Sequence, residues 1–88
     1  MASQPTPVLD NLESQLVSLI SDQILETHAG FDADSNLYEA GLDSMALMQL
    51  LIVVEKEYGV SIPENALTKQ NFSTTRHLAQ LIRERRAV

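Results

Sequence analysis

One stretch of the chain, residues 44–58, restricts the possible folds more than any other. Its apolar residues recur at helical spacing, and at about 100° per residue they form two groups on different sides of one helix. The larger group predicts a core-facing stripe and consists of Leu47, Leu50, Leu51, Val54 and Tyr58. The smaller group consists of Met45, Met48 and Ile52, on a side shared with Gln49 and Lys56.

A helix of a small bundle has one face to bury, so the smaller group predicts a surface that meets partners. Methionine suits such a surface because its flexible side chain adapts to differing shapes. The alternative is that Met48 and Ile52 are wide-angle core residues, covered by the long segment 31–43. Gln49 and Lys56 belong to the predicted partner surface as well.

A first helix is predicted over about 11–27, because apolar residues recur there at helical spacing. Asp10 can cap its start, and Gly30 is a natural left-handed stop with Phe31 folding back as an apolar latch. The polar connection over 31–43 is longer than most links between helices, and such loops are often functional. Its apolar side chains should hold it against the bundle: Leu37, Tyr38 and Leu42.

The rest of the chain predicts one short helix and one longer one. Gly59 should end the helix over 44–58, and Pro63 suits the first position of a short third helix over 63–67. Ser73 or Thr74 then caps a fourth helix that runs to about residue 86. Its inward-facing residues should be Leu78, Leu81 and Ile82. With no strand-like alternation of useful length, the predicted fold class is all-α, a small four-helix bundle with one short helix.

Length and composition place the chain among small single domains. Its 88 residues suffice for one core, and we expect a disordered leader over 1–8 followed by one domain over 9–86. The absence of cysteine excludes disulfides, thiolate metal sites and cysteine nucleophiles. No apolar run reaches the roughly 18 residues of a membrane span, and the start is unlike a signal peptide. We therefore expect a cytoplasmic, stand-alone monomer that does not enter a membrane.

The charge is distributed very unevenly along the chain. The net charge is -6, and residues 1–55 contain nine acidic residues and no Lys or Arg. Four arginines fall in the last 13 positions, where they complement the negative end of a helix dipole. Because most of this surface would repel phosphates, we expect no nucleic-acid partner.

Ser44 stands at the start of the apolar helix without an evident catalytic partner. A nucleophile elbow needs glycine two residues to either side, and here those positions hold Leu42 and Ala46. The two imidazoles, His28 and His77, are each expected at a helix end or on a solvated face. At a helix start, the free amides and the dipole favour an anion, so a phosphodiester on this serine would be stabilised. The sequence indicates no catalytic residue.

A calcium loop is the competing interpretation of the acidic segment before Ser44. Acidic or amide side chains occupy positions 1, 3, 5 and 12 of a loop similar to an EF-hand: Asp32, Asp34, Asn36 and Asp43. The sixth position, which needs glycine, is Leu37, and the twelfth is Asp instead of the bidentate Glu. We therefore predict no metal site.

Residues 41–45, Gly-Leu-Asp-Ser-Met, resemble the modification motif of the acyl and peptidyl carrier proteins. The similarity extends over about 9–86 as helix, long loop, Asp-Ser, helix, short helix, helix. It implies an acyl-carrier-protein-like fold in which Ser44 receives covalent 4'-phosphopantetheine from coenzyme A. It also implies that Asp43 helps a phosphopantetheinyl transferase to position its metal and coenzyme A.

By the same resemblance, the protein catalyses nothing itself, and the thiol of its prosthetic arm holds an acyl or aminoacyl group as a thioester. The residues Met45, Met48 and Ile52 match positions that family members use to dock enzymes. Carriers of fatty-acid synthesis typically show acidic residues on this face, whereas Ala46, Gln49 and Lys56 face outward here. The chain is therefore most similar to stand-alone carriers loaded by adenylating ligases, with downstream transfer enzymes as further partners.

Two alternatives remain open from the sequence. One is a fatty-acyl or polyketide carrier, which an acyltransferase would load instead of an ATP-dependent ligase. The other comes from a different class, an unmodified helical interaction domain that uses the methionine-rich face without a prosthetic group.

Overall fold

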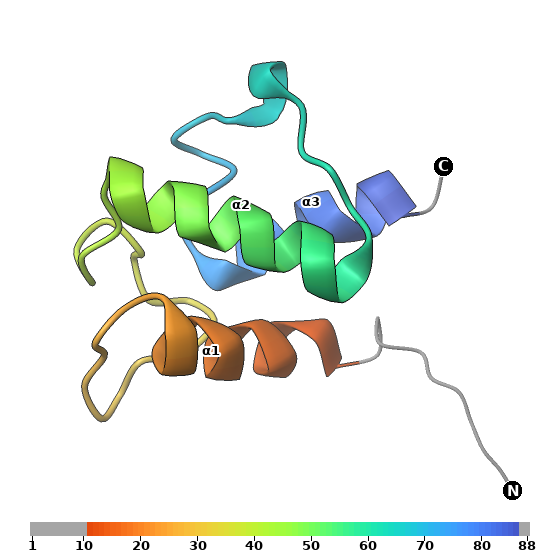
Figure 1. Ribbon diagram of the computed structural model, residues 1–88. Helices are drawn as coiled ribbons and strands as arrows, with labels where there is room; N and C mark the ends of the chain where they lie inside the picture. The colour runs from red at the N-terminus through yellow and green to blue at the C-terminus, as the bar shows by residue number, and fades with distance from the viewer. Residues whose placement is uncertain (1–10, 87–88) are drawn as a thin grey trace, which may run out of the picture.

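The computed structural model describes residues 11–86, which form three α-helices and one 3-10 turn (Figure 1). The elements are α1 (Leu12–Gln23), α2 (Ser44–Tyr58), η2 (Glu64–Ala66) and α3 (Thr75–Arg86). Between residues 11 and 86, β-pairing is limited to one isolated bridge, Asn36 with Thr74. The predicted all-α class is confirmed, with a 3-10 turn in place of the short third helix.

The helices α2 and α3 run in the opposite direction to α1, and α2 begins at the end of the molecule where α1 finishes (Figure 1). The core consists of one contiguous cluster to which every helix contributes. Residues with no exposed surface include Leu16, Ile20, Leu50, Leu78 and Ile82. None of the helices within residues 11–86 is long and apolar enough to span a lipid bilayer.

The first helix is shorter than its apolar pattern suggests. We expected an end near residue 27 with Gly30 as the stop, and this was wrong, because α1 ends at Gln23. The amides of Ile24 and Leu25 both donate to the Ile20 carbonyl, at 3.0 and 2.9 Å, as the chain turns away. After this turn Leu25 belongs to the core at 9% exposure, and the burial of its apolar side chain favours the early end of the helix.

Two N-terminal predictions, the leader over 1–8 and the cap at Asp10, lie outside the described residues. Asn11 is the N-cap residue of α1 in the structure, and its side chain makes no capping hydrogen bond.

The connection between α1 and α2 is held down as its apolar residues predict. Leu37 and Leu42 are buried, and Tyr38 packs against the core from its edge. Two backbone hydrogen bonds also tie the connection to the start of α3, from the Leu37 amide to the Ser73 carbonyl and from the Arg76 amide to the Ala33 carbonyl. The loop therefore presents the start of α2 at a fixed place.

The buried stripe of α2 is turned relative to the predicted one. Leu50, Val54 and Tyr58 are buried as expected, but Leu47 is only partly buried. Ala46, which we expected to face outward, is 8% exposed and belongs to the core. Ala46 shares the core cluster with Leu25 of the segment after α1, so the buried stripe of α2 is turned toward that segment.

The end of α2 and the start of α3 agree with the turn residues of the sequence, whereas Pro63, expected at the first position of the short helix, precedes η2 as its N-cap. Gly59 ends α2 in the left-handed conformation at φ 69°, and its amide donates to the Glu55 carbonyl. The hydroxyl of Thr74 accepts a hydrogen bond from the His77 amide at 3.1 Å, so Thr74 is the residue that caps α3. The inward-facing residues predicted for this helix are all buried.

Candidate functional site

Ser44 is the first residue of α2, and its side chain is exposed. Asp43 precedes it in an extended conformation and caps the helix, because its carboxylate accepts a hydrogen bond from the Ala46 amide at 2.9 Å. The Leu47 amide donates to the Asp43 carbonyl and so closes the first helical turn. Ser44 therefore projects from a capped helix end on a rigid bundle.

The capping arrangement leaves the amides of Ser44 and Met45 as the donors at this helix end. They precede the residues whose amides can bond within the helix, and such groups commonly bind anions. A phosphodiester on the Ser44 oxygen would lie beside these amides and the positive end of the helix dipole. The site therefore fits a phosphate-linked group on the serine.

A shallow groove of about 340 Å³ lies next to the serine, between the segment after α1 and the first turns of α2. Its walls come from residues 24–26, residues 40–41 and one side of α2, where Asp43, Met45, Ala46 and Gln49 line it. Asp43 and Met45 flank Ser44 in sequence, so the serine stands at the rim of the groove.

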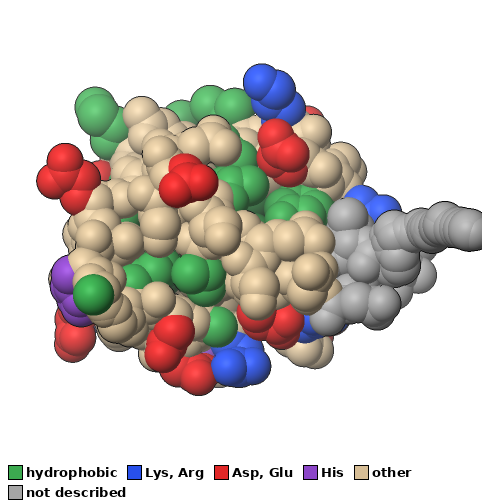
Figure 2. Space-filling model, turned by 90° about the horizontal axis from the view of Figure 1, so that it is seen from below, with side chains coloured by type: hydrophobic (Ala, Val, Ile, Leu, Met, Phe, Trp, Pro, Cys, Tyr) green, Lys and Arg blue, Asp and Glu red, His purple; other side chains and the backbone are tan. Residues whose placement is uncertain are grey.

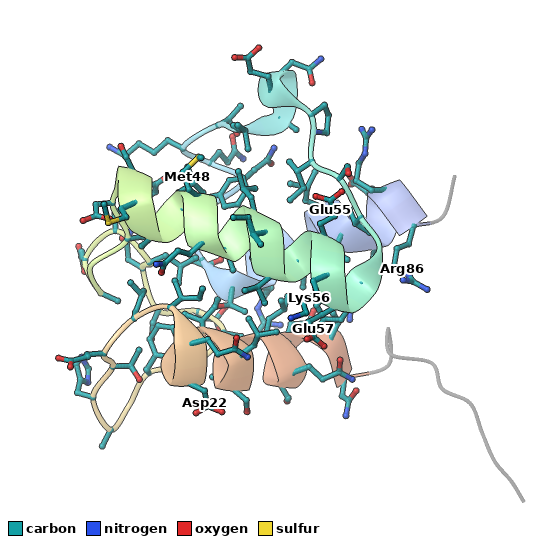
Figure 3. All side chains as sticks on the ribbon, in the orientation of Figure 1. Asp22, Met48, Glu55, Lys56, Glu57 and Arg86 are labelled. Atoms are coloured by element: carbon teal, nitrogen blue, oxygen red, sulfur yellow. The ribbon has the colours of Figure 1, made fainter. Side chains whose placement is uncertain are left out.

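The predicted second apolar face of α2 is exposed, as expected. Met45, Met48 and Ile52 retain 73%, 62% and 63% of their surface, so none of them is core. Gln49 and Lys56 are also exposed. Figure 3 shows Met48 and Glu55 on the side of α2 away from α1, whereas Lys56 and Glu57 lie on the side toward α1. The predicted partner residues therefore form a broad surface that wraps around part of the helix.

The imidazoles lie at turns and helix ends. His77 contacts the Thr74 hydroxyl through Nδ1 at 2.7 Å, at the start of α3, and His28 is exposed in the turn after α1. Within residues 11–86 no hydrogen bond joins either ring to Ser44.

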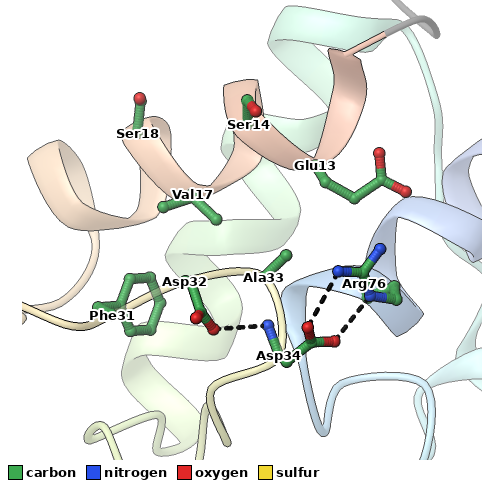
Figure 4. Close-up of a pocket in the computed structure, with 9 residues that line it drawn as sticks. All are labelled: Glu13, Ser14, Val17, Ser18, Phe31, Asp32, Ala33, Asp34 and Arg76. Carbon is green, nitrogen blue, oxygen red and sulfur yellow. Dashed lines mark hydrogen bonds and ion pairs between the residues drawn. The ribbon is translucent and has the colours of Figure 1, made fainter.

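The acids of the calcium-loop pattern have other partners in the structure. Asp32 accepts a hydrogen bond from the Asp34 amide, and Asp34 forms a two-point ion pair with Arg76, at 2.7 and 3.0 Å (Figure 4). The Arg76 hydrogen bond also lowers the pKa of the Asp34 carboxyl. Asp32 therefore stabilises the turn, Asp34 pairs with Arg76, and Asp43 caps α2. In the part of the chain described, no three His, Asp or Glu residues form a metal-binding group.

Sequence reasoning missed the capping role of Asp43 and the groove. Aspartate directly before the apolar helical run is a capping signal that could have revealed the role of Asp43. The groove depends on the early end of α1, for which the sequence carries no clear signal.

The architecture and the exposed serine at a capped helix start are those of a helical carrier protein. Residues 14–82 match the family of the phosphopantetheine attachment site. Among solved structures, this chain superposes with a TM-score of 0.71 on a chain in one ligase complex. That complex holds an engineered Bradyrhizobium japonicum glycine:[carrier protein] ligase with carrier protein from Agrobacterium tumefaciens and ATP. That match has 21% identity and covers 84% of this chain and 99% of the other. A chain in the complex of the Bradyrhizobium japonicum ligase with its cognate carrier protein and an analogue of glycyl adenylate superposes with a TM-score of 0.66. That match has 23% identity and covers 89% of this chain and 99% of the other.

Curated relatives agree with the fold. The chain is 31% identical to an acyl carrier protein of Rickettsia bellii over 62 residues, which cover 69% of this chain and 72% of the relative. It is 24% identical to aminoacyl carrier protein 2 of Bradyrhizobium diazoefficiens over 74 residues, 82% and 83% of the two chains. The chain therefore belongs to the phosphopantetheine-dependent carrier proteins, whose cofactor is covalently attached 4'-phosphopantetheine.

Proposed function

We propose that Ser44 carries the 4'-phosphopantetheine and that an ATP-dependent adenylating ligase loads the arm with an aminoacyl group. The observation that carries this proposal is the exposed Ser44 hydroxyl at the capped start of α2, beside amides suited to a phosphate. When bound, the prosthetic group supplies a terminal thiol that holds the cargo as a thioester.

The attachment step transfers the phosphopantetheinyl group of coenzyme A to the serine, catalysed by a phosphopantetheinyl transferase. The Ser44 oxygen forms a bond to the phosphorus that carries pantetheine, and the bond from this phosphorus to the adenosine-bearing phosphate breaks. Adenosine 3',5'-bisphosphate leaves, and the hydroxyl proton passes to the transferase. Asp43, next to the reacting oxygen, is proposed to help position the transferase's metal and coenzyme A.

The partner surface favours aminoacyl over fatty-acyl cargo. Of its exposed positions, Met45, Met48 and Ile52 are apolar, Gln49 is neutral and Lys56 is basic. A partner that recognises a row of acids would find few on this surface. The likeness to aminoacyl carrier protein 2 and to chains in glycine:[carrier protein] ligase complexes supports the same choice.

Intact-mass measurement tests the attachment. The protein is incubated with coenzyme A and a broad-specificity transferase, and we expect a gain equal to one phosphopantetheine. The Ser44→Ala variant should gain nothing, while Ser18→Ala, which removes another exposed serine, should gain as the parent does. A gain on Ser44→Ala, or none on the parent, would refute the attachment to Ser44.

Loading then separates the two carrier classes. We expect the modified protein to gain an aminoacyl mass with an adenylating ligase, ATP and an amino acid. The similarity to Rickettsia acyl carrier protein favours the second candidate, a fatty-acyl carrier. Loading by an acyltransferase, with none by the ligase, would establish that candidate.

A further inference from the structure

We infer that the groove beside Ser44 is a resting site for the pantetheine part of the prosthetic arm. The inference rests on the proposed attachment to Ser44 and concerns what this chain does with the arm between visits of its partner enzymes. The groove is open to solvent, and its volume of about 340 Å³ is at the lower end of the range of small-molecule pockets.

The groove has the composition that a neutral amide chain requires. Its apolar lining includes Ile24, Leu25, Met45 and Ala46, of which Leu25 and Ala46 are less than one-tenth exposed. Gln49 lies among them, and its side-chain amide makes no hydrogen bond within the described part of the chain. Pantetheine consists of two secondary amides, a dimethyl-substituted carbon and short methylene segments. Gln49 can both donate to and accept from such amides, while the apolar lining covers the methyl and methylene groups.

The charges of the groove select which part of the arm enters it. Glu26 and Asp43 line it, and no Lys or Arg does. The phosphodiester is bonded to Ser44 and lies at the free amides of the α2 start, while the Glu26 carboxylate would repel it from the groove. The uncharged pantetheine segment carries no such penalty. The phosphate therefore stays at the helix end, and the segment beyond it enters the groove.

The arm is long enough for this path. From Ser44 to Gln49 the helix surface covers about 140° and about 7.5 Å along the axis, roughly 14 Å in total at a radius of about 5 Å. The arm extends to roughly 17 Å if its 14 or so bonds advance as those of an extended polypeptide do. Met45 lies between the two residues and also lines the groove. The arm can therefore reach the groove by passing over Met45.

Tethering makes even a weak contact effective. A short flexible tether gives an effective concentration on the order of millimolar, so a contact with a dissociation constant near 1 mM would be populated about half of the time. Because Met45 and Gln49 belong both to the groove and to the proposed partner surface, a docked enzyme would displace the arm. Docking would then free the thiol at the place where it is needed.

The test is an NMR comparison of the apo protein with the protein modified by coenzyme A carrying ¹³C-labelled pantetheine. We expect amide shift changes at residues 24–26, 40–41 and 49, and nuclear Overhauser contacts from the pantetheine methyl groups to the Ile24, Leu25 or Met45 methyls. Gln49→Ala should weaken these contacts several-fold. Gln23→Ala, which removes a nearby glutamine that does not line the groove, should leave them unchanged.

The possible NMR and mass results distinguish the resting site from the attachment at Ser44. A modified protein whose shift changes are confined to residues 43–47, with no methyl contacts, would overturn the resting site and leave the attachment at Ser44 intact. Contacts that persist equally in Gln49→Ala would also overturn the recognition described here. An absence of mass gain at Ser44 would overturn both proposals.

Discussion

Asp43 combines two roles that a single substitution would confuse. The sequence suggested only an assisting role in modification, and the structure adds a cap, since the carboxylate accepts a hydrogen bond from the Ala46 amide. Asparagine retains this acceptor without the charge, whereas alanine loses both. The pair Asp43→Asn and Asp43→Ala therefore separates the two roles.

We predict that Asp43→Ala lowers the free energy of unfolding by about 1 kcal/mol, and that Asp43→Asn lowers it by about 0.5 kcal/mol or less. Both should slow attachment of phosphopantetheine at least tenfold, because both remove the negative charge. Urea unfolding followed by circular dichroism measures the first effect, and a time course of intact mass measures the second. An Asp43→Asn protein that is modified at the parent rate would restrict Asp43 to capping.

At the scale of helices, the ion pair between α1 and α3 is the principal polar link. Arg83 donates to both Glu13 oxygens, at 2.6 and 2.8 Å. The side chains are only 31% and 24% exposed, so solvent screens this pair less than one on the open surface. The hydrogen bond from Arg83 lowers the pKa of Glu13 from 4.5 to about 2.

This shift gives the stability a defined pH dependence. Because the pKa of Glu13 is depressed in the folded state, its contribution is fully present above the ordinary value and is lost as the pH falls from about 5 toward 2. We predict that Glu13→Gln lowers the free energy of unfolding by about 1–2 kcal/mol at pH 7 and reduces the loss of stability between pH 5 and 2.

Urea unfolding at pH 7, 5 and 3 measures this, with Glu39→Gln as the control, because Glu39 is exposed in the connection before α2. If Glu13→Gln and the parent show the same pH profile, the pair does not contribute to stability.

At the scale of the whole molecule, the sequence predicted best where one residue determines the local backbone. Gly59 ends α2 and Thr74 caps α3 because each supplies a conformation or an acceptor that the helix end needs. The predictions failed where packing between distant segments decides the local structure. The chain leaves helical geometry after Gln23 and buries Leu25, and Ala46 joins the same core cluster instead of facing outward. The exposed position of Ser44 at the start of α2 was predictable because its motif is local, whereas the groove beside it depends on how the segment after α1 lies against α2.

Charge on the whole molecule sets the background for partner binding. Figure 2 shows acidic side chains spread over the face on which α1 lies, whereas the α2 surface after Ser44 presents the three large exposed apolar side chains of residues 11–86. Large exposed apolar residues next to the proposed modification site favour a docking surface, where a few side chains supply most of the binding energy.

Glutamate substitutions on α2 test this surface. Met48→Glu and Ile52→Glu should each reduce kcat/KM for loading by the cognate ligase at least tenfold, a loss of about 1.4 kcal/mol or more, because each buries a charge in an apolar interface. The free energy of unfolding should change by less than about 0.5 kcal/mol in each variant, since both positions are exposed. Loading of protein modified beforehand separates this effect from any effect on the transferase. Gln80→Glu, on the exposed side of α3, controls for the added charge. Unchanged loading of Met48→Glu and Ile52→Glu would place the docking surface elsewhere.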